Sequence, residues 1–250
     1  MGFVLLEGGS EFNAGMAAAD ERAMAVCGGR AQPVRIIPAA AAPDNNHARA
    51  AANGVSWFQS LGAADVRAVD IIDRASADRP DLAKEIERAR LVFVLGGCTR
   101  YLAKTLSESL AWQAMVSAHR AGAVIAGSSA GAMVLCKHYF DPNSGKVLPG
   151  LNLLPKVCVL PHHDTFGKDW APQLTSLLPG ALLIGIDEET GLLNDGPEGQ
   201  WTVYGKGAVT VYEADRQAVF QHGQRFVLPI AVRDHSRNES GIDSSKQKKK

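Results

Sequence analysis

The sequence lacks the features that mark membrane and secreted proteins. No apolar run approaches the roughly 20 residues of a membrane-spanning helix, and the first residues lack the basic start of a signal peptide. Four cysteines stand far apart, at positions 27, 98, 136 and 158, with no Cys-x-x-Cys pair. This usage favours reduced thiols over a disulfide framework or a zinc site. We therefore expect a cytoplasmic location and no membrane partner.

The chain also lacks an excess of charge of either sign. Its 250 residues include 26 Lys and Arg against 26 Asp and Glu, a balance that argues against a general nucleic-acid binder. The neutral total conceals a polar end, residues 233–250, which holds six basic and three acidic residues. We expect this end to be a disordered tail and residues 1–232 to form a single domain. A hydrophobic fraction of 46% supports a globular body.

Apolar strands alternate with helical stretches along this body. Continuously apolar strands separated by helices indicate a mostly parallel sheet with helices on both faces, an α/β fold. After residue 191 the pattern changes to short strands with tight turns, which predicts an antiparallel meander at residues 201–204, 208–212 and 218–221. The expected earlier strands are residues 3–7, 33–38, 66–72, 91–95, 123–126, 156–160 and 181–186, and the expected helices include 14–27, 46–61, 81–90 and 99–120.

The strongest chemical signal is the run Gly127-Ser128-Ser129-Ala130-Gly131. It follows an expected buried strand and precedes a short helical stretch, the setting of a Gly-x-Ser-x-Gly nucleophile elbow. Small residues leave room for a sharp turn that exposes the Ser129 hydroxyl and directs the N–H of Ala130 toward a developing oxyanion. A plain Gly- and Ala-rich turn is the alternative, and Ser128 is a competing hydroxyl.

A serine hydroxyl needs a base, and the base needs an orienting carboxylate. His162 and His163 follow one expected strand, and the acids at residues 187–189 follow the next. Both groups lie at the carboxyl edge of the parallel sheet, where active sites form. The alternatives are a capped strand end and a solvated acidic loop. A Gly96-Gly97 turn after another strand offers a further oxyanion donor, or is simply a tight turn into a helix.

These motifs together resemble the cyanophycinase and dipeptidase E family of serine peptidases. The resemblance spans about residues 3–226 and rests on the Gly-Gly turn, Gly-x-Ser-Ala-Gly-Ala, Pro-His and Gly-Ile-Asp-Glu-Glu-Thr. It implies a three-layer, flavodoxin-like fold similar to class I glutamine amidotransferases and no metal or organic cofactor. It assigns a catalytic triad, Ser129, His162 and Glu188, and oxyanion N–H groups of Gly97 and Ala130, with Gly96 as the alternative to Gly97.

The resemblance also implies a small peptide substrate with an aspartyl residue at the scissile bond. Arg100, Lys168 and His163 are candidates for substrate binding, since a carboxylate needs a cationic or donor partner. The cyanophycinase pattern places His-Phe before an arginine-rich stretch, which residues 162–170 lack. The sequence leaves open His162 against His163 as base, and a homodimer against a monomer. A glutamine amidotransferase-like subunit, disfavoured because that class has Cys at the elbow, and a non-catalytic binding module are the alternative functions.

Overall fold

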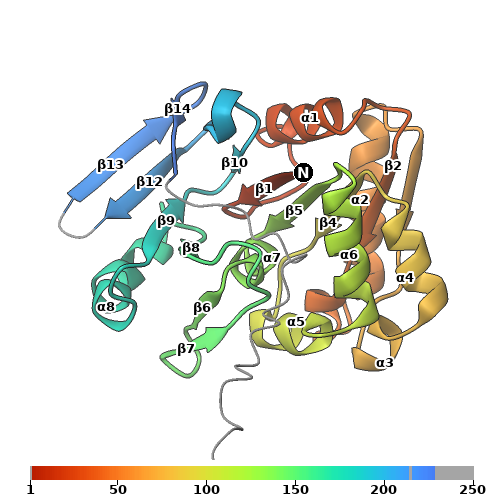
Figure 1. The fold of residues 1–250 in the computed structure, drawn as a ribbon, viewed down its shortest axis with the longest axis horizontal. Helices are drawn as coiled ribbons and strands as arrows, with labels where there is room; N and C mark the ends of the chain where they lie inside the picture. Colours follow the sequence, from red (N-terminus) through yellow and green to blue (C-terminus); the bar gives the residue numbers. More distant parts are fainter. Residues whose placement is uncertain (1, 214–215, 229–250) are drawn as a thin grey trace, which may run out of the picture.

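The computed structural model describes residues 2–213 and 216–228, and the tail expected at 233–250 lies outside the described residues. Within the described part, eight strands form a sheet in the order β14-β11-β10-β1-β5-β4-β2-β3 (Figure 1). The five strands from β1 to β3 run parallel, and the other three are antiparallel to their neighbours. Their bounds are β1 Phe3–Glu7, β2 Pro33–Ile37, β3 Asp65–Ala68, β4 Leu91–Val94, β5 Val124–Ser128, β10 Thr190–Leu193, β11 Trp201–Gly205 and β14 Arg225–Phe226.

A second sheet of four strands, in the order β13-β12-β9-β8, lies beside the first (Figure 1). It joins the parallel pair β8 (Val157–Leu160) and β9 (Leu182–Ile186) to the antiparallel strands β12 (Ala208–Glu213) and β13 (Arg216–Gln221). The expected antiparallel end of the chain is therefore confirmed, but it is shared between two sheets. A hairpin of β6 (His138–Asp141) and β7 (Lys146–Pro149) was not predicted.

Helices cover both faces of the larger sheet, as the alternating sequence pattern predicts. One face of the sheet packs against α1 and α2, and the other packs against α4 to α7. Each strand contributes side chains to both faces, because successive strand residues point to opposite sides. In β4, Leu91 and Phe93 pack in the core on the α1 and α2 face, while Val92 and Val94 pack in the core on the face of α4 to α7. The helices are α1 Ala17–Val26, α2 His47–Ser60, α3 Arg74–Ala77, α4 Pro80–Glu87, α5 Thr99–Leu106, α6 Leu110–Arg120, α7 Ala130–Leu135 and α8 Ala171–Leu177, with short 3-10 turns η1 Ala39–Ala41, η2 Gly167–Trp170 and η3 Pro197–Gly199.

The single helix expected over residues 99–120 is wrong, since the structure has two helices there. Glu108 adopts a left-handed backbone conformation, with φ of 58°, which ends the run of helical hydrogen bonds. Ser109 then caps α6, because its side chain accepts a hydrogen bond from the backbone N–H of Trp112. The apolar periodicity continues across this break, and therefore does not reveal it.

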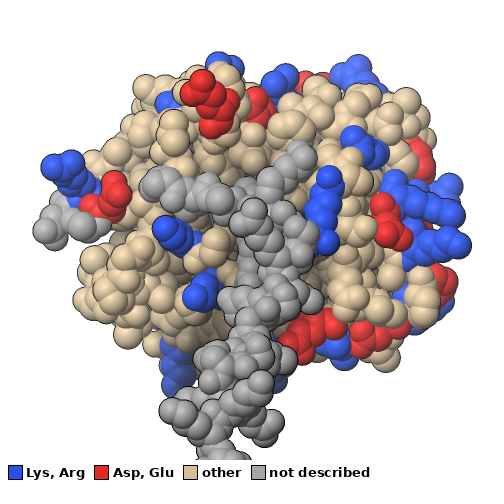
Figure 2. Space-filling view, viewed as in Figure 1, with Lys and Arg blue, Asp and Glu red and all other residues tan. Residues whose placement is uncertain are grey.

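The surface of the described residues agrees with the charge balance. On the face shown in Figure 2, basic and acidic side chains are interspersed around the rim rather than gathered into a field of one sign. None of the helices in residues 2–213 and 216–228 has the length and apolar character that crossing a bilayer requires.

Candidate active site

Ser129 occupies the turn between β5 and α7, as the elbow motif predicts. Its backbone φ of 49° and ψ of −111° lie outside the ordinary regions, a conformation that costs about 1–3 kcal/mol. The flanking glycines make the turn possible: a Cβ on Gly127 would lie 2.5 Å from the carbonyl carbon of Gly131, and a Cβ on Gly131 would overlap the Val94 carbonyl. The N–H of Ser129 donates to the Glu7 carbonyl at 3.0 Å, which fixes the turn to β1.

His162 lies beside Ser129, just beyond the end of β8. Its Nε2 is 2.9 Å from Ser129 Oγ, the distance of a nucleophile–base hydrogen bond. Its backbone also has a positive φ, 49°, and its N–H donates to the Gly8 carbonyl at 2.8 Å. Phe166 stacks on the imidazole with a centroid separation of 5.0 Å. The Gly8 carbonyl therefore fixes the His162 backbone, and Phe166 covers one face of the imidazole ring.

Glu188 completes a hydrogen-bonded chain with these two residues. Its Oε1 lies 2.7 Å from His162 Nδ1, and its Oε2 accepts a hydrogen bond from Ser10 Oγ at 2.7 Å. The hydrogen bond from Ser10, and then that from His162, lowers the pKa of the Glu188 carboxyl below its ordinary value. The carboxylate is thus ionised at neutral pH, and it holds the imidazole with Nδ1 protonated and Nε2 free to accept from Ser129.

The neighbouring His163 has different partners. Its buried ring contacts Asp187 Oδ1 through Nδ1 at 3.3 Å and the Tyr212 hydroxyl through Nε2 at 2.7 Å. Asp187 in turn accepts from the Ala208 N–H at 2.8 Å. His163 therefore links the turn after β9 to β12. His162, and not His163, contacts Ser129.

The Gly96-Gly97 turn after β4 lies against the nucleophile. A Cβ on Gly96 would lie 3.3 Å from Ser129 Cβ, so the turn borders the space in front of the hydroxyl. Gly97 has a φ of +137°, and its missing side chain leaves room for the Ala40 carbonyl. Ala130 begins α7 immediately after Ser129. The backbones expected to supply the oxyanion donors, Gly97 and Ala130, thus flank Ser129 from two elements.

One known protein family matches most of the chain. The sequence model of peptidase family S51 matches residues 4–201. The chain belongs to peptidase family S51. It is 29% identical over 183 residues to the cyanophycinase of Geminocystis herdmanii, covering 68% of this chain and 66% of that one. It is 30% identical over 167 residues to that of Trichormus variabilis, covering 62% of this chain and 56% of the relative. The alignments thus span slightly more than half to two thirds of those curated relatives.

One solved structure supports the same family, and a second shares the fold. A peptidase from an acI-B1 actinobacterium superposes with a TM-score of 0.83 at 27% identity, covering 91% of this chain and 97% of the other. A putative peptidase E from Listeria monocytogenes EGD-e gives a TM-score of 0.58 at 18% identity, covering 83% of this chain and all of the other, and shares the fold. Within the described residues of this S51 chain, no group of His, Cys, Asp and Glu is arranged to hold a metal ion.

The loop after β1 braces this S51 site, and sequence reasoning missed it. In addition to the bonds from Glu7, Gly8 and Ser10, the Gly9 carbonyl accepts from the Glu189 N–H at 3.1 Å and Glu11 Oε2 accepts from Ser128 Oγ at 2.8 Å. Each of the five consecutive residues 7–11 thereby contacts Ser129, His162 or Glu188, or a sequence neighbour of one of them. The signal in the sequence was the pair Gly8-Gly9: a Cβ on Gly9 would lie 2.7 Å from His162 Nδ1.

A pair of buried carboxyl groups lies at the base of this loop. Glu7 and Asp20 are both fully buried, and the Trp57 indole N–H donates to Asp20 Oδ2 at 2.8 Å. Burial raises the pKa of Glu7 well above its ordinary value and that of Asp20 to about 7. The nearby carboxylate of Glu11 adds to both shifts. Neither forms an ion pair with any described residue, so no cation offsets a negative charge on either carboxyl, and the raised pKa values favour protonation of the pair at acidic pH.

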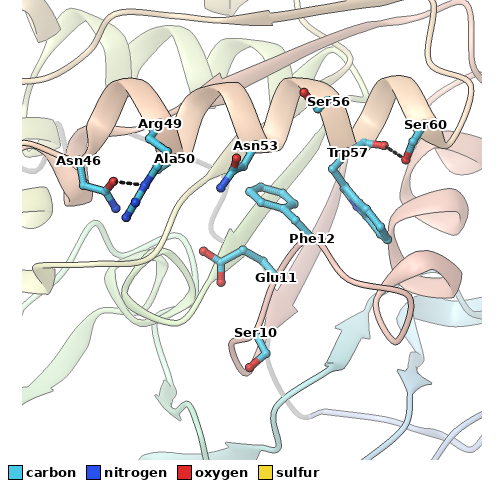
Figure 3. Close-up of a pocket in the computed structure, with 10 residues that line it drawn as sticks. All are labelled: Ser10, Glu11, Phe12, Asn46, Arg49, Ala50, Asn53, Ser56, Trp57 and Ser60. Atoms are coloured by element: carbon cyan, nitrogen blue, oxygen red, sulfur yellow. Dashed lines mark hydrogen bonds between the residues drawn. The ribbon is translucent and has the colours of Figure 1, made fainter.

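A cavity of about 730 Å³ opens between this loop and α2 (Figure 3). The expected substrate-binding residues Arg100 and Lys168 do not line it and lie exposed on α5 and η2. The basic residue in its lining is Arg49, whose Nε donates to Asn46 Oδ1 at 2.8 Å. The lining residues are Ser10, Glu11, Phe12, Asn46, Arg49, Ala50, Asn53, Ser56, Trp57 and Ser60.

Proposed function

We propose that the chain is a serine peptidase that cleaves small peptides through a Ser-His-Glu mechanism, with Ser129, His162 and Glu188 as the triad. The observation that carries the proposal is the continuous hydrogen-bonded chain from Ser129 Oγ through the imidazole to Glu188, with distances of 2.9 and 2.7 Å. Membership of peptidase family S51 supports it. The serine at the elbow disfavours a glutamine amidotransferase-like subunit, and the intact chain of contacts disfavours a non-catalytic module.

In the proposed reaction, Ser129 Oγ attacks the carbonyl carbon of the scissile amide while its proton passes to His162 Nε2. The N–H groups of Ala130 and Gly97 stabilise the oxyanion that forms. The C–N bond then breaks, and the leaving amine takes the proton from His162. A water molecule then attacks the ester carbonyl and gives its proton to His162. The C–Oγ bond breaks, Ser129 Oγ takes the proton back from His162, and the acid is released. Glu188 remains ionised and stabilises the imidazolium throughout.

We propose an aspartyl residue beside the scissile bond as the preferred substrate. The relatives named cyanophycinase support this substrate class, and Arg49 supplies a guanidinium in the lining of the cavity that also contains Ser10, the hydrogen-bond partner of Glu188. A guanidinium is suited to a carboxylate because it can form two parallel hydrogen bonds. Arg49 is thus a better placed partner than Arg100 or Lys168, which lie outside the cavity lining.

Substitution of the nucleophile tests the activity. Ser129→Ala is expected to reduce hydrolysis of Asp-X, β-Asp-X and other dipeptides by at least about 10³-fold and to abolish labelling by a serine-directed phosphonate. The matched control is Ser128→Ala, which removes the neighbouring hydroxyl and is expected to keep the labelling. Circular dichroism verifies that both variants fold. Undiminished hydrolysis by folded Ser129→Ala would refute the proposal.

A further inference from the structure

The cavity between α2 and the loop after β1 is connected to the proposed triad through two of its lining residues. Ser10 in its lining donates to the triad carboxylate of Glu188, and Glu11 accepts from the hydroxyl next to the nucleophile. Figure 3 shows Glu11 and Phe12 on the loop facing Asn53 on α2, with Arg49 further along the same helix. A substrate residue bound in this cavity would therefore contact the same loop that holds Glu188 and Ser128.

Glu11 places a carboxylate oxygen close to Ser129. Its Oε2 accepts from Ser128, while Oε1 lies 3.6 Å from the position that a Cβ on Gly96 would take. Ser129 Cβ lies 3.3 Å from the same point. The carboxylate oxygen and the nucleophile thus flank one small space in front of the Gly96 backbone. Glu11 is only partly exposed, and it has no ion pair within the described residues.

We propose that Glu11 binds the free ammonium group of the substrate residue that contributes the scissile carbonyl. This proposal rests on the proposed peptidase function and makes the enzyme selective for peptides with an unblocked amino terminus. A carboxylate with an unused oxygen at this position attracts a cation and repels an anionic group. An amino-terminal aspartyl residue fits the cavity's two charges, since its ammonium faces Glu11 and its free carboxylate has Arg49 available.

The alternative is that Glu11 only holds the nucleophile turn through Ser128. The two roles predict different kinetics. A charged hydrogen bond to the substrate contributes to binding and depends on the substrate's own charge, whereas a bond within the turn affects every substrate equally. A comparison of free and blocked peptides therefore distinguishes them.

The experiment measures kcat and KM for one cleaved dipeptide in its free and N-acetylated forms. For the wild-type enzyme, acetylation is expected to raise KM at least about tenfold, because it removes the charge that Glu11 binds. Glu11→Gln keeps an acceptor for Ser128 and loses the charge, so it is expected to raise KM for the free peptide about tenfold and to leave KM for the acetylated peptide within about threefold.

Ser128→Ala is the matched control, since it removes the bond within the turn and keeps the Glu11 charge. It is expected to preserve the preference for the free peptide. The proposal is overturned if the wild-type enzyme accepts both peptides equally, or if Glu11→Gln weakens both to the same extent. Phosphonate labelling of Ser129 distinguishes failure of the peptidase proposal from failure of the Glu11 proposal. Absence of labelling in the wild-type protein refutes the peptidase function. Labelling of an enzyme that does not distinguish free from acetylated peptides refutes only the role of Glu11.

Discussion

The buried carboxyl pair makes the stability of the protein depend on pH in an unusual direction. We expect Asp20→Asn to remove much of this dependence. The amide keeps an oxygen that accepts from the Trp57 indole and has the same size as the carboxyl group, while its NH₂ group cannot lose a proton in this range. The variant thus changes the charge of the site and little of its packing.

The expected magnitude follows from the pKa of Asp20, which burial raises from 3.8 to about 7. Between these values the folded protein keeps a proton that the unfolded chain releases, so the free energy of unfolding falls as pH rises through the window. A shift of about three pH units corresponds to about 4 kcal/mol, fully lost above pH about 7. The raised pKa of Glu7 acts in the same direction.

Urea denaturation followed by circular dichroism at about pH 4, 6 and 8 measures the effect. The difference in unfolding free energy, Asp20→Asn minus wild type, is expected to increase by up to about 4 kcal/mol over this range. Titrating groups far from the pair are common to both proteins and cancel in the difference. The part of the Glu7 shift that arises from Asp20 is lost in the variant and adds to the same trend. Asp44→Asn, which neutralises an exposed carboxylate, is expected to show no such trend. A difference for Asp20→Asn that stays constant with pH would refute the reasoning.

Two further predictions concern the geometry of the triad. Gly9→Ala is expected to lower kcat at least about 100-fold, because its Cβ would displace the His162 ring. Gly29→Ala, which is also at a positive φ but has open space around its Cβ, controls for backbone strain. Equal kinetics in the two variants would contradict the explanation. His162→Ala is expected to lose about 10³-fold or more in kcat, while His163→Asn keeps more than about a tenth, as measured with a cleaved dipeptide; the reverse order would show that His163 is the base.

Much of the fold and of the site could be predicted because the signals are local. The elbow is visible in sequence because a sharp turn demands small residues directly around Ser129. The histidine doublet and the acids at 187–189 could be grouped because parallel strands end at a common edge. These arguments place residues in one neighbourhood. They do not say which side chain of a doublet points to which partner.

The remaining features depend on backbone geometry and on contacts between distant residues. A positive φ at His162 turns this residue, rather than its neighbour, toward Ser129. The residue types in Leu160-Pro161-His162-His163 do not reveal this backbone conformation, and only the resemblance to the serine peptidase family favoured His162. Ser10 contacts a residue 178 positions away, so its role appears only once the sheet has formed. The division into two sheets also depends on which edges pair, which strand patterns do not specify.

The bracing by residues 7–11 has a consequence for the order in which the protein becomes reactive during its synthesis. The bracing loop, residues 7–11, leaves the ribosome before the groups it holds, which follow at residues 129, 162 and 188. Ser129 is therefore synthesised well before the imidazole and carboxylate that activate it. Under the proposed mechanism, Ser129 gains its reactivity only when strands β8 and β9, which follow it in the chain, dock against this loop.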